Sequence, residues 1–341
     1  MSENNCCCCS SGGCCGTPVV PTVSTRLTFK DKLGVWKMRW GIGRMDYTVD
    51  PGLYAVGKPD ESSSVLVSAN YKLTFDTLRK NLSGVDCWLL ILDTKGINVW
   101  CAAGKGTFGT DELVNRIEAV GLSGIVKHKK LILPQLGASG VSGYEVTKRT
   151  GFSVAFGPVR ASDIKAYIAA GYKTTKEMRE VKFTMWDRLV LTPLELVQSA
   201  KVSFMVFGVL FLINLFAARP FGLWDFLAYA ASVLIGTVIT PVLLPFIPGK
   251  AFAFKGWLLG AIGTAAIVWA YGWFAPPFLL LGIGYMLALP VHSAYLAMNF
   301  TGASTYTSPS GVLKEMKIAI PLIVASLLAG VTLILIKTFM G

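Results

Sequence analysis

Apolar runs and amphipathic segments alternate through the first half of the chain, from about residue 58 to residue 182. Short apolar runs predict strands at 65–69, 87–92, 97–100, 131–136 and 152–156. Segments with apolar residues at helical spacing predict helices at 74–82, 110–120 and 161–170. Strands that are apolar on both faces and alternate with amphipathic helices are typical of a parallel sheet that is covered on both sides. The pattern therefore predicts an α/β domain over residues 25–190, with a mostly parallel, Rossmann-like sheet.

The second half of the chain consists of long apolar stretches with almost no charge. Residues 201–341 hold seven of the 32 Lys and Arg and two of the 20 Asp and Glu. A helix needs roughly 20 apolar residues to cross a bilayer, so charge-free stretches of this length predict membrane spans. Five are predicted, at about 200–218, 225–247, 256–275, 277–298 and 318–338. Residues 191–341 are therefore predicted to form an all-α transmembrane domain.

The basic residues predict how these spans are oriented. Four lysines fall in loops on the side of the N-terminal domain, whereas two basic residues fall on the other side. The first set is Lys250, Lys255, Lys314 and Lys317, and the second is Arg219 and Lys337. Short cytoplasmic loops carry an excess of Lys and Arg. We therefore expect a multi-pass protein of the cytoplasmic (inner) membrane, with a cytoplasmic N-terminal domain and an external C-terminus.

Composition narrows the class of protein. A hydrophobic content of 53% and a mean hydropathy of +0.54 exclude an ordinary soluble protein. The net charge of +12 is expected to serve membrane topology and contact with anionic membrane lipid. The basic residues do not alternate with aromatic residues in a recognisable nucleic-acid module, so no nucleic-acid partner is predicted.

Residues 1–24 have no periodicity and are rich in Gly, Ser and Pro, which predicts a flexible tail. Six of the eight cysteines lie there, namely Cys6, Cys7, Cys8, Cys9, Cys14 and Cys15. Four adjacent cysteines lack the spacing of a zinc knuckle, so no structural zinc site is predicted. Two alternatives stay open: a loose site for a soft metal ion, or a tail whose cysteines are incidental or lipid-modified.

The stretch GINVWCAAGKG, residues 96–106, holds the most distinctive candidate chemistry. Cys101 follows the predicted strand 97–100, and ligands of open α/β sheets bind beyond the carboxyl ends of strands. The small residues 102–104 would let a large flat ligand come close to the thiol. A phosphate-binding loop is excluded because Gly106, rather than Ser or Thr, follows Lys105. The residues alone leave open whether Cys101 is a ligand, a nucleophile or a buried core cysteine.

Residues 98–105, NVWCAAGK, resemble the signature of the mercury-methylating corrinoid proteins (HgcA). That family is related to the corrinoid iron–sulfur protein of the acetyl-CoA pathway. Further likeness lies at 65–82, 131–146, 156–164 and 299–316, and in the five C-terminal spans, so the resemblance covers most of the chain. Residue 68 is Ser where Thr is expected, which keeps the hydroxyl, and the cysteine run of the tail is not part of the family pattern.

The resemblance implies a membrane-anchored, corrinoid-dependent methyltransferase that transfers methyl from a cobalamin-type cobalt corrinoid to inorganic mercury(II), giving methylmercury. Cys101 would be the catalytic residue, its thiolate serving as the lower axial cobalt ligand in a cap segment at 98–121. The implied cofactor-binding residues are Ser68, Asn98, Val99, Trp100, Cys101, Ala102, Ala103, Gly104, Lys105, Gly137, Gly157, Pro158 and Val159. Asn98 would act by hydrogen bonds at the turn, Trp100 by packing, and Lys105 by supporting the thiolate.

Two partner systems are implied with it. A methyl-folate-dependent system would supply the methyl group, and a ferredoxin-like protein with iron–sulfur clusters would reduce the cobalt. Residues 25–341 contain only Cys87 and Cys101, which are too few to hold a cluster. Cys87 lies within a predicted strand and is expected to be a core residue.

Two other functions stay open. The chain could carry methyl on a corrinoid to another acceptor in one-carbon metabolism, or it could be a non-enzymatic, thiol-rich metal-binding membrane protein. His128 is the alternative axial ligand in the α/β domain, although its lysine neighbours favour a surface position. His292 falls in the fourth span, where an ionisable residue has either a functional role or a hydrogen bond to another helix.

Overall fold

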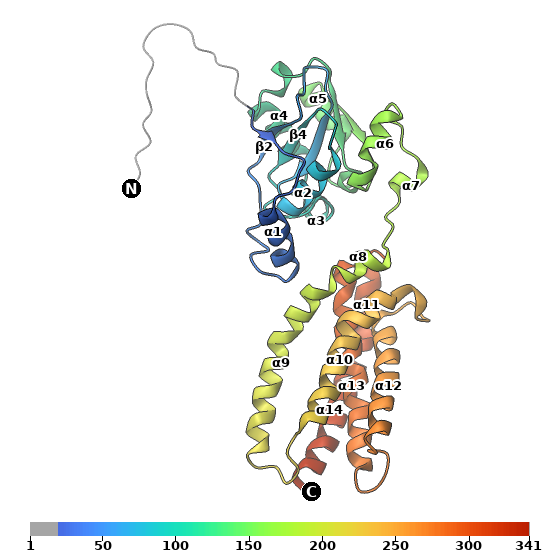
Figure 1. Ribbon diagram of the computed structural model, residues 1–341. Coiled ribbons are helices and arrows are strands. Elements are labelled where there is room, and N and C mark those ends of the chain that lie inside the picture. The colour runs from blue at the N-terminus through green and yellow to red at the C-terminus, as the bar shows by residue number, and fades with distance from the viewer. Residues whose placement is uncertain (1–19, 341) are drawn as a thin grey trace. The chain divides into compact units, whose positions relative to one another are not determined.

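The structure is a computed structural model that describes residues 20–340 (Figure 1). The chain divides into two compact units, Met1–Val35 with Met45–Glu180, and Trp36–Arg44 with Val181–Gly341. The six tail cysteines lie outside the described residues. Thr22 and Val23, which the sequence assigned to the tail, form an edge strand because they pair with residues 55 and 56.

The described residues of the first unit form a six-stranded sheet in the order β1-β2-β4-β3-β5-β6. Its strands are β1 (Thr22–Val23), β2 (Gly52–Val56), β3 (Val65–Ala69), β4 (Cys87–Leu92), β5 (Lys130–Leu133) and β6 (Ser153–Phe156). β2 runs antiparallel to β4, and the other pairs are parallel. The prediction of a mostly parallel α/β sheet is confirmed, with β1 and β2 as additions that the sequence pattern did not reveal.

Helices cover both faces of this sheet. The unit contains α2 (Lys72–Asn81), α3 (Val99–Lys105), α4 (Thr110–Ala119), α5 (Gly143–Thr150), α6 (Ile164–Ala169) and α7 (Lys176–Arg179), and α1 (Phe29–Arg39) begins in it. Apolar residues of α3, α4 and α5 share one core cluster with Val65, Val67 and Ala69 of β3. Residues of α2 and α6 share another cluster with Leu66. Alternate residues of one strand thus face opposite cores, which explains why all of β3 is buried.

Two predicted strands have different ends in the structure. Residues 97–100 are not a strand, because Asn98 caps a helix that begins at Val99. The predicted strand 131–136 ends at Leu133, since Pro134 leads into the 3₁₀ turn η2 (Gln135–Gly137). Proline has no N–H to donate to a sheet, which accounts for the second boundary.

The second unit is helical. Its main helices are α9 (Thr192–Asn214), α10 (Leu223–Leu234), α12 (Phe252–Ala270), α13 (Leu279–Asn299) and α14 (Pro309–Met340), with the short α8 (Met185–Leu189) ahead of them. α10 continues through the π-helical turn η4 (Ile235–Ile239), α11 (Thr240–Leu243) and the 3₁₀ turn η5 (Leu244–Phe246). Over residues 20–340, five helices are long and apolar enough to cross a membrane, which confirms the predicted number of apolar spans.

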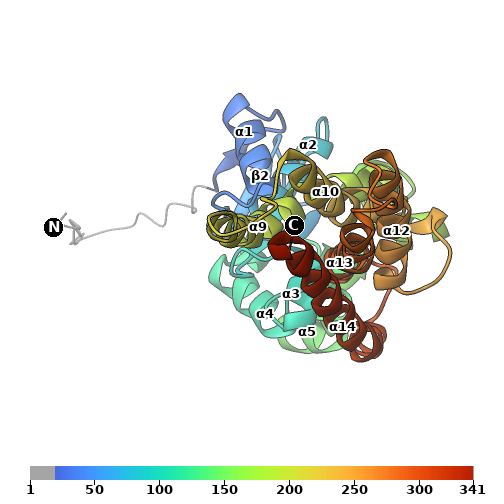
Figure 2. The same cartoon turned by 90° about the horizontal axis from the view of Figure 1, so that it is seen from below.

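Small residues let α12, α13 and α14 pack closely. A Cβ atom on Gly260 would lie 2.9 Å from Cα of Pro290 on α13, and one on Gly330 of α14 would lie 2.8 Å from N of Ala288. Close backbone approach at small residues is a common way for helices to associate in a bilayer. α9 is packed much less tightly, because only 6% of an 18-residue apolar stretch within Met185–Asn214 is buried. Figure 2 shows α13 lying between α12 and α14, with α9 set apart from these three.

Candidate functional site

A buried asparagine shapes the loop that leads to Cys101. Asn70 directly follows β3, and its Oδ1 accepts hydrogen bonds from N of Thr94 (3.1 Å), Oγ1 of Thr94 (2.8 Å) and N of Gly96 (3.1 Å). Its Nδ2 donates to Oδ1 of Asp93 at 3.2 Å. The loop after β4 is thereby tied to the carboxyl end of β3, so the segment that follows has a fixed starting point.

Asn98 then fixes both the start of α3 and the thiol. Its Oδ1 accepts a hydrogen bond from N of Cys101 at 3.0 Å, which caps the helix. Its Nδ2 donates to Sγ of Cys101 at 3.6 Å. One side chain therefore satisfies an orphan N–H of the helix and orients the sulfur.

The two faces of α3 have different roles. Val99, Ala102 and Ala103 are buried in the core that packs on β3 and β5. Trp100, Cys101, Gly104 and Lys105 are exposed, with Trp100 at 44%. Residues three and four apart are neighbours on a helix surface, so Gly104 and Lys105 lie on the same face as the thiol. Of the predicted small residues, only Gly104 leaves space beside Cys101, because the two alanines point into the core.

The loop after β5 packs against this helix. A Cβ atom on Gly137 would lie 2.5 Å from Cε1 of Phe108, and one on Gly140 would lie 2.2 Å from O of Phe108 and 3.0 Å from Cα of Ala103. Both glycines are therefore needed for close packing of the protein on itself. The side chain of Phe108 occupies the space that a Cβ atom on Gly137 would take, and contact between Gly137 and a cofactor stays a prediction.

Gln135 supplies an unused acceptor in the same loop. Its Oε1 is buried and has no hydrogen-bond partner among the described residues. Buried polar atoms without a partner are rare and call for an explanation, such as a bound group that donates to them. Gln135 begins η2, which lies against α3, so this acceptor is near the cap helix.

The other predicted cofactor contacts are spread over the unit. Ser68 is buried in β3 and, by strand alternation, shares the face of Leu66 rather than the face that packs on α3. Gly157, Pro158 and Val159 follow β6, and N of Gly157 donates to O of Leu133 at 2.8 Å. They lie beyond the carboxyl end of β6, which is the neighbour of β5 in the sheet.

His128 and Cys87 have structural roles. N of Lys130 donates to Nδ1 of His128 at 3.3 Å, so Nε2 carries the proton and donates to O of Ser63 at 2.9 Å. His128 precedes β5 and therefore lies at the opposite edge of the sheet from the loop after β5. Cys87 is buried as expected, and burial, with a smaller contribution from the Asp86 carboxylate, raises the pKa of its thiol to about 12.

No group of three or more His, Cys, Asp or Glu side chains within residues 20–340 is arranged to hold a metal ion. Cys101 is the exposed cysteine of that part of the chain, and its sulfur is available for a single bond to a ligand or substrate. The candidate site is therefore one oriented thiol on a small open helix face, next to a loop with one unused acceptor.

Comparison with known proteins finds similarity over part of this chain. Residues 41–168 match the family described as the CO dehydrogenase/acetyl-CoA synthase delta subunit. The matched stretch runs from before β2 into α6, so it includes the cap helix α3 and the loop after β5. It does not include residues 181–341.

Several curated proteins are similar to part of this chain. The gamma subunit of the acetyl-CoA decarbonylase/synthase complex from Methanocaldococcus jannaschii is 33% identical over 140 residues, covering 40% of this chain and 28% of the relative. The gamma subunit from Methanopyrus kandleri is 35% identical over 122 residues, covering 35% and 26%. The gamma 2 subunit from Methanosarcina thermophila is 41% identical over 99 residues, covering 28% and 21%. The chain thus spans about a quarter of the length of these relatives.

Proposed function

We propose that this protein is a membrane-anchored, corrinoid-dependent methyltransferase whose acceptor is inorganic mercury(II), with methylmercury as the product. The observation that carries the proposal is the exposed Cys101 thiol, oriented by Asn98 on a helix that packs over the parallel sheet. Similarity of this unit to subunits of acetyl-CoA synthase complexes supports one-carbon chemistry. The likeness of residues 98–105 to the mercury-methylating corrinoid proteins supports the choice of cofactor and acceptor.

The residues of the site fit a cobalt corrinoid. The ring is broad and flat, and Gly104 leaves the space beside the thiol open, since a Cβ atom there would have no neighbour within 4 Å. A single sulfur would suffice to hold the group, because the corrin ring itself carries the cobalt. The absence of a cluster of metal ligands in residues 20–340 is compatible with such a cofactor.

A methylated corrinoid bound at this site would supply a methyl group for transfer to an electrophile, and Cys101 would hold its cobalt through an electron-rich sulfur. Cys101 would present that sulfur, and the N–H of Asn98 would hold its orientation while sharing its charge. Lys105, one turn further along α3, would add positive charge on the same face. Trp100, which is half-exposed, would shield one side of the site from water.

Two further systems belong to this proposal. A methyl-folate-dependent donor would recharge the cofactor, and a ferredoxin-like protein with iron–sulfur clusters would act as reductant. The five apolar helices would anchor the unit in the lipid of the membrane.

The first experiment tests the cofactor and its ligand. Full-length protein is purified in detergent with the six tail cysteines changed to Ser, so that Cys101 is the exposed thiol under study. It is reconstituted anaerobically with cobalamin, alongside Cys101→Ala and the surface control Lys95→Ala. We expect about one cobalt per chain and a sulfur-ligated absorption spectrum that only Cys101→Ala loses. Identical spectra with and without Cys101 would refute its role as ligand, and lack of binding by all three would refute the corrinoid proposal.

The second experiment tests the acceptor. Protein carrying methylcobalamin is mixed in a single turnover with mercury(II), and methylmercury is measured against time. We expect about one equivalent of methylmercury from the parent protein and at least tenfold slower formation by Cys101→Ala. The names of the relatives favour one alternative, a methyl carrier for another one-carbon acceptor. Faster transfer to reduced folate than to mercury(II) would support that alternative instead.

A further inference from the structure

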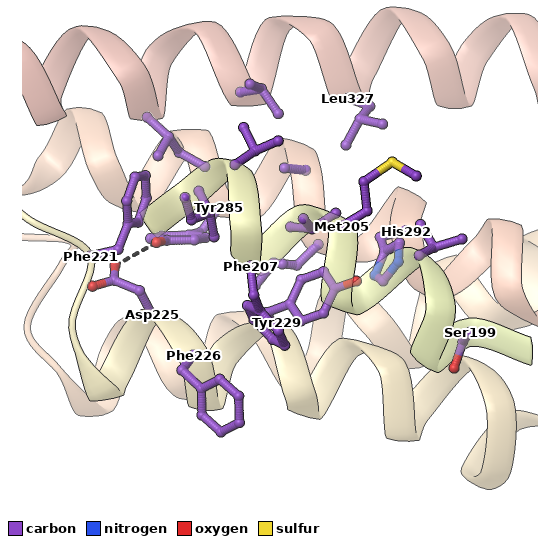
Figure 3. A pocket seen from close by; sticks show the side chains of 18 of the residues that line it. Ser199, Met205, Phe207, Phe221, Asp225, Phe226, Tyr229, Tyr285, His292 and Leu327 are labelled. Atoms are coloured by element: carbon purple, nitrogen blue, oxygen red, sulfur yellow. Dashed lines mark hydrogen bonds between the residues drawn. The ribbon is translucent and has the colours of Figure 1, made fainter. Parts of the chain in front are cut away.

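The second unit contains a large cavity that the proposed chemistry does not use. Its volume is about 940 Å³, and it lies between α9 and the three helices α10, α13 and α14 (Figure 3). The lining is mostly apolar, and aromatic rings are prominent in it, including Phe207, Phe226 and Tyr229. The loose packing of α9 creates this space, because the other spans pack closely through small residues.

A histidine and a tyrosine stand together in the wall of this cavity. The rings of His292 on α13 and Tyr229 on α10 stack with their centroids 5.0 Å apart and their planes at 23° (Figure 3). Both residues lie inside apolar spans. Polar side chains at this depth are costly to bury, so a pair that faces a cavity is a candidate binding site.

The hydrogen bonds around His292 define its tautomer. Oγ of Ser232 donates its one proton to O of Tyr229 at 2.7 Å. With that proton engaged, we assign Nδ1–H of His292 as the donor in its 2.9 Å contact with the same Oγ. In a neutral ring, Nε2 therefore holds a lone pair. No donor in the described part of the chain lies within hydrogen-bond distance of it.

The same argument applies to Tyr229. Oγ of Ser203 donates to O of Ser199 at 3.0 Å, so in its 3.0 Å contact with Oη of Tyr229 it is the acceptor. The phenol proton of Tyr229 is thereby used, and its oxygen keeps lone pairs. His292 and Tyr229 thus both present acceptors to the cavity.

Polar groups near the other end of the cavity are already paired. The Asp225 carboxylate accepts hydrogen bonds from Tyr285 (dashed in Figure 3) and from Arg219. Asn214 exchanges two hydrogen bonds with the backbone of Phe221. Asp225 and Asn214 therefore have partners within the protein, whereas the stacked pair of His292 and Tyr229 keeps lone pairs that face the cavity.

We propose that this cavity binds a lipid-soluble hydroquinone, that is, an aromatic ring with hydroxyl groups on a long apolar tail. The hydroxyl would donate to Nε2 of His292 and Oη of Tyr229, the ring would stack among the aromatic side chains, and the tail would fill the apolar remainder. The oxidised quinone has carbonyl acceptors in place of the hydroxyl donors, so it would meet two acceptors, and no donor, at His292 and Tyr229. A long-chain alcohol has a donor but lacks the ring.

The test compares these three ligands on full-length protein in lipid nanodiscs. Decyl hydroquinone kept reduced under anaerobic conditions, decyl quinone and 1-decanol are equilibrated with the discs, and bound ligand is quantified by mass spectrometry after subtraction of empty discs. We expect the hydroquinone to bind about tenfold more tightly than either other ligand, the equivalent of roughly one net hydrogen bond. His292→Leu should reduce its affinity to that of the quinone, and Tyr229→Phe should weaken it severalfold. Tyr271→Phe, a tyrosine change outside the cavity lining, should have no effect.

Ser232→Ala provides the sharper variant. Without Oγ to accept from Nδ1, the His292 proton can move to Nε2, and the preference for the reduced ligand over the oxidised ligand should shrink. Equal binding of hydroquinone and quinone that does not depend on His292 would overturn the proposal and leave ordinary lipid as the occupant. Binding of decanol as tight as that of the hydroquinone would overturn the aromatic headgroup. Each variant is checked for an unchanged elution volume and thermal transition before its affinity is compared.

Discussion

At the scale of single residues, two cysteines in one unit have opposite environments. Cys87 is fully buried with a pKa raised to about 12, whereas Cys101 is exposed and oriented by Asn98. Because a thiolate is the reactive form, we expect iodoacetamide at pH 8 to alkylate Cys101 at least ~100-fold faster than Cys87. Peptide-level mass spectrometry separates the two from the tail cysteines. Comparable labelling of both would contradict the burial of Cys87.

Asn98 offers a matched pair of variants for this assay. Asn98→Asp keeps an acceptor for N of Cys101 but replaces the N–H donor to Sγ with a carboxylate oxygen. Asp caps helices as well as Asn does, so α3 should persist while alkylation of Cys101 slows. Asn98→Ala removes the cap as well, which costs roughly 1 kcal/mol of helix stability. Unchanged alkylation in Asn98→Asp would show that the contact to sulfur has no effect on reactivity.

At the scale of elements, α3 and the loop after β5 act as one packed assembly. A Cβ atom at Gly140 would collide with backbone atoms of residues 103 and 108, so Gly140→Ala should destabilise the contact by about 1–3 kcal/mol. Hydrogen exchange of the peptide covering 93–110 should accelerate by roughly fivefold to 150-fold.

Gly104→Ala is the variant that tests the open face of α3. The added methyl group meets open space, and alanine favours a helix by up to about 1 kcal/mol relative to glycine. Hydrogen exchange of the same peptide should therefore stay equal or become slower. If the corrin ring lies on this face of α3, Gly104→Ala should bind cobalamin more weakly while the helix stays intact. Unchanged affinity for cobalamin would show that the ring does not lie there.

The elements also show what the sequence could and could not predict. β3 and β4 were predictable as apolar runs because the central strands of this covered sheet are buried on both faces. The run at 97–100 was misread as a strand because its apolar residues outweighed the capping signal of Asn98. β1 has two residues and α5 buries only Val146, so neither leaves a strong pattern. The motif at 98–105 identified the thiol, but which small residues lie beside it depends on the helical phase of α3. The roles of Gly137 and Ser68 depend on tertiary packing and strand phase, and the stacked pair at His292 depends on contacts between helices far apart in the chain.

At the scale of the whole molecule, the charge distribution makes a prediction about topology. Five crossings would place the two ends of the chain on opposite sides of the membrane, and the charges of the connections favour a cytoplasmic first unit. Lys250 lies in the connection before α12, and Lys314 and Lys317 lie in the first turns of α14, whereas Arg219 lies in the connection before α10. Alkaline phosphatase fused after Gly341 should therefore be active, and the same enzyme inserted at residues 304–308 should be inactive. Changing Lys250, Lys255, Lys314 and Lys317 to Gln should produce a mixture of the two orientations, because these lysines favour the cytoplasmic side. Arg219→Gln should strengthen the preference for a single orientation. An inactive C-terminal fusion in the unaltered protein would reverse the assignment, and it would also place Cys101 outside the reducing compartment in which a free thiol ligand persists.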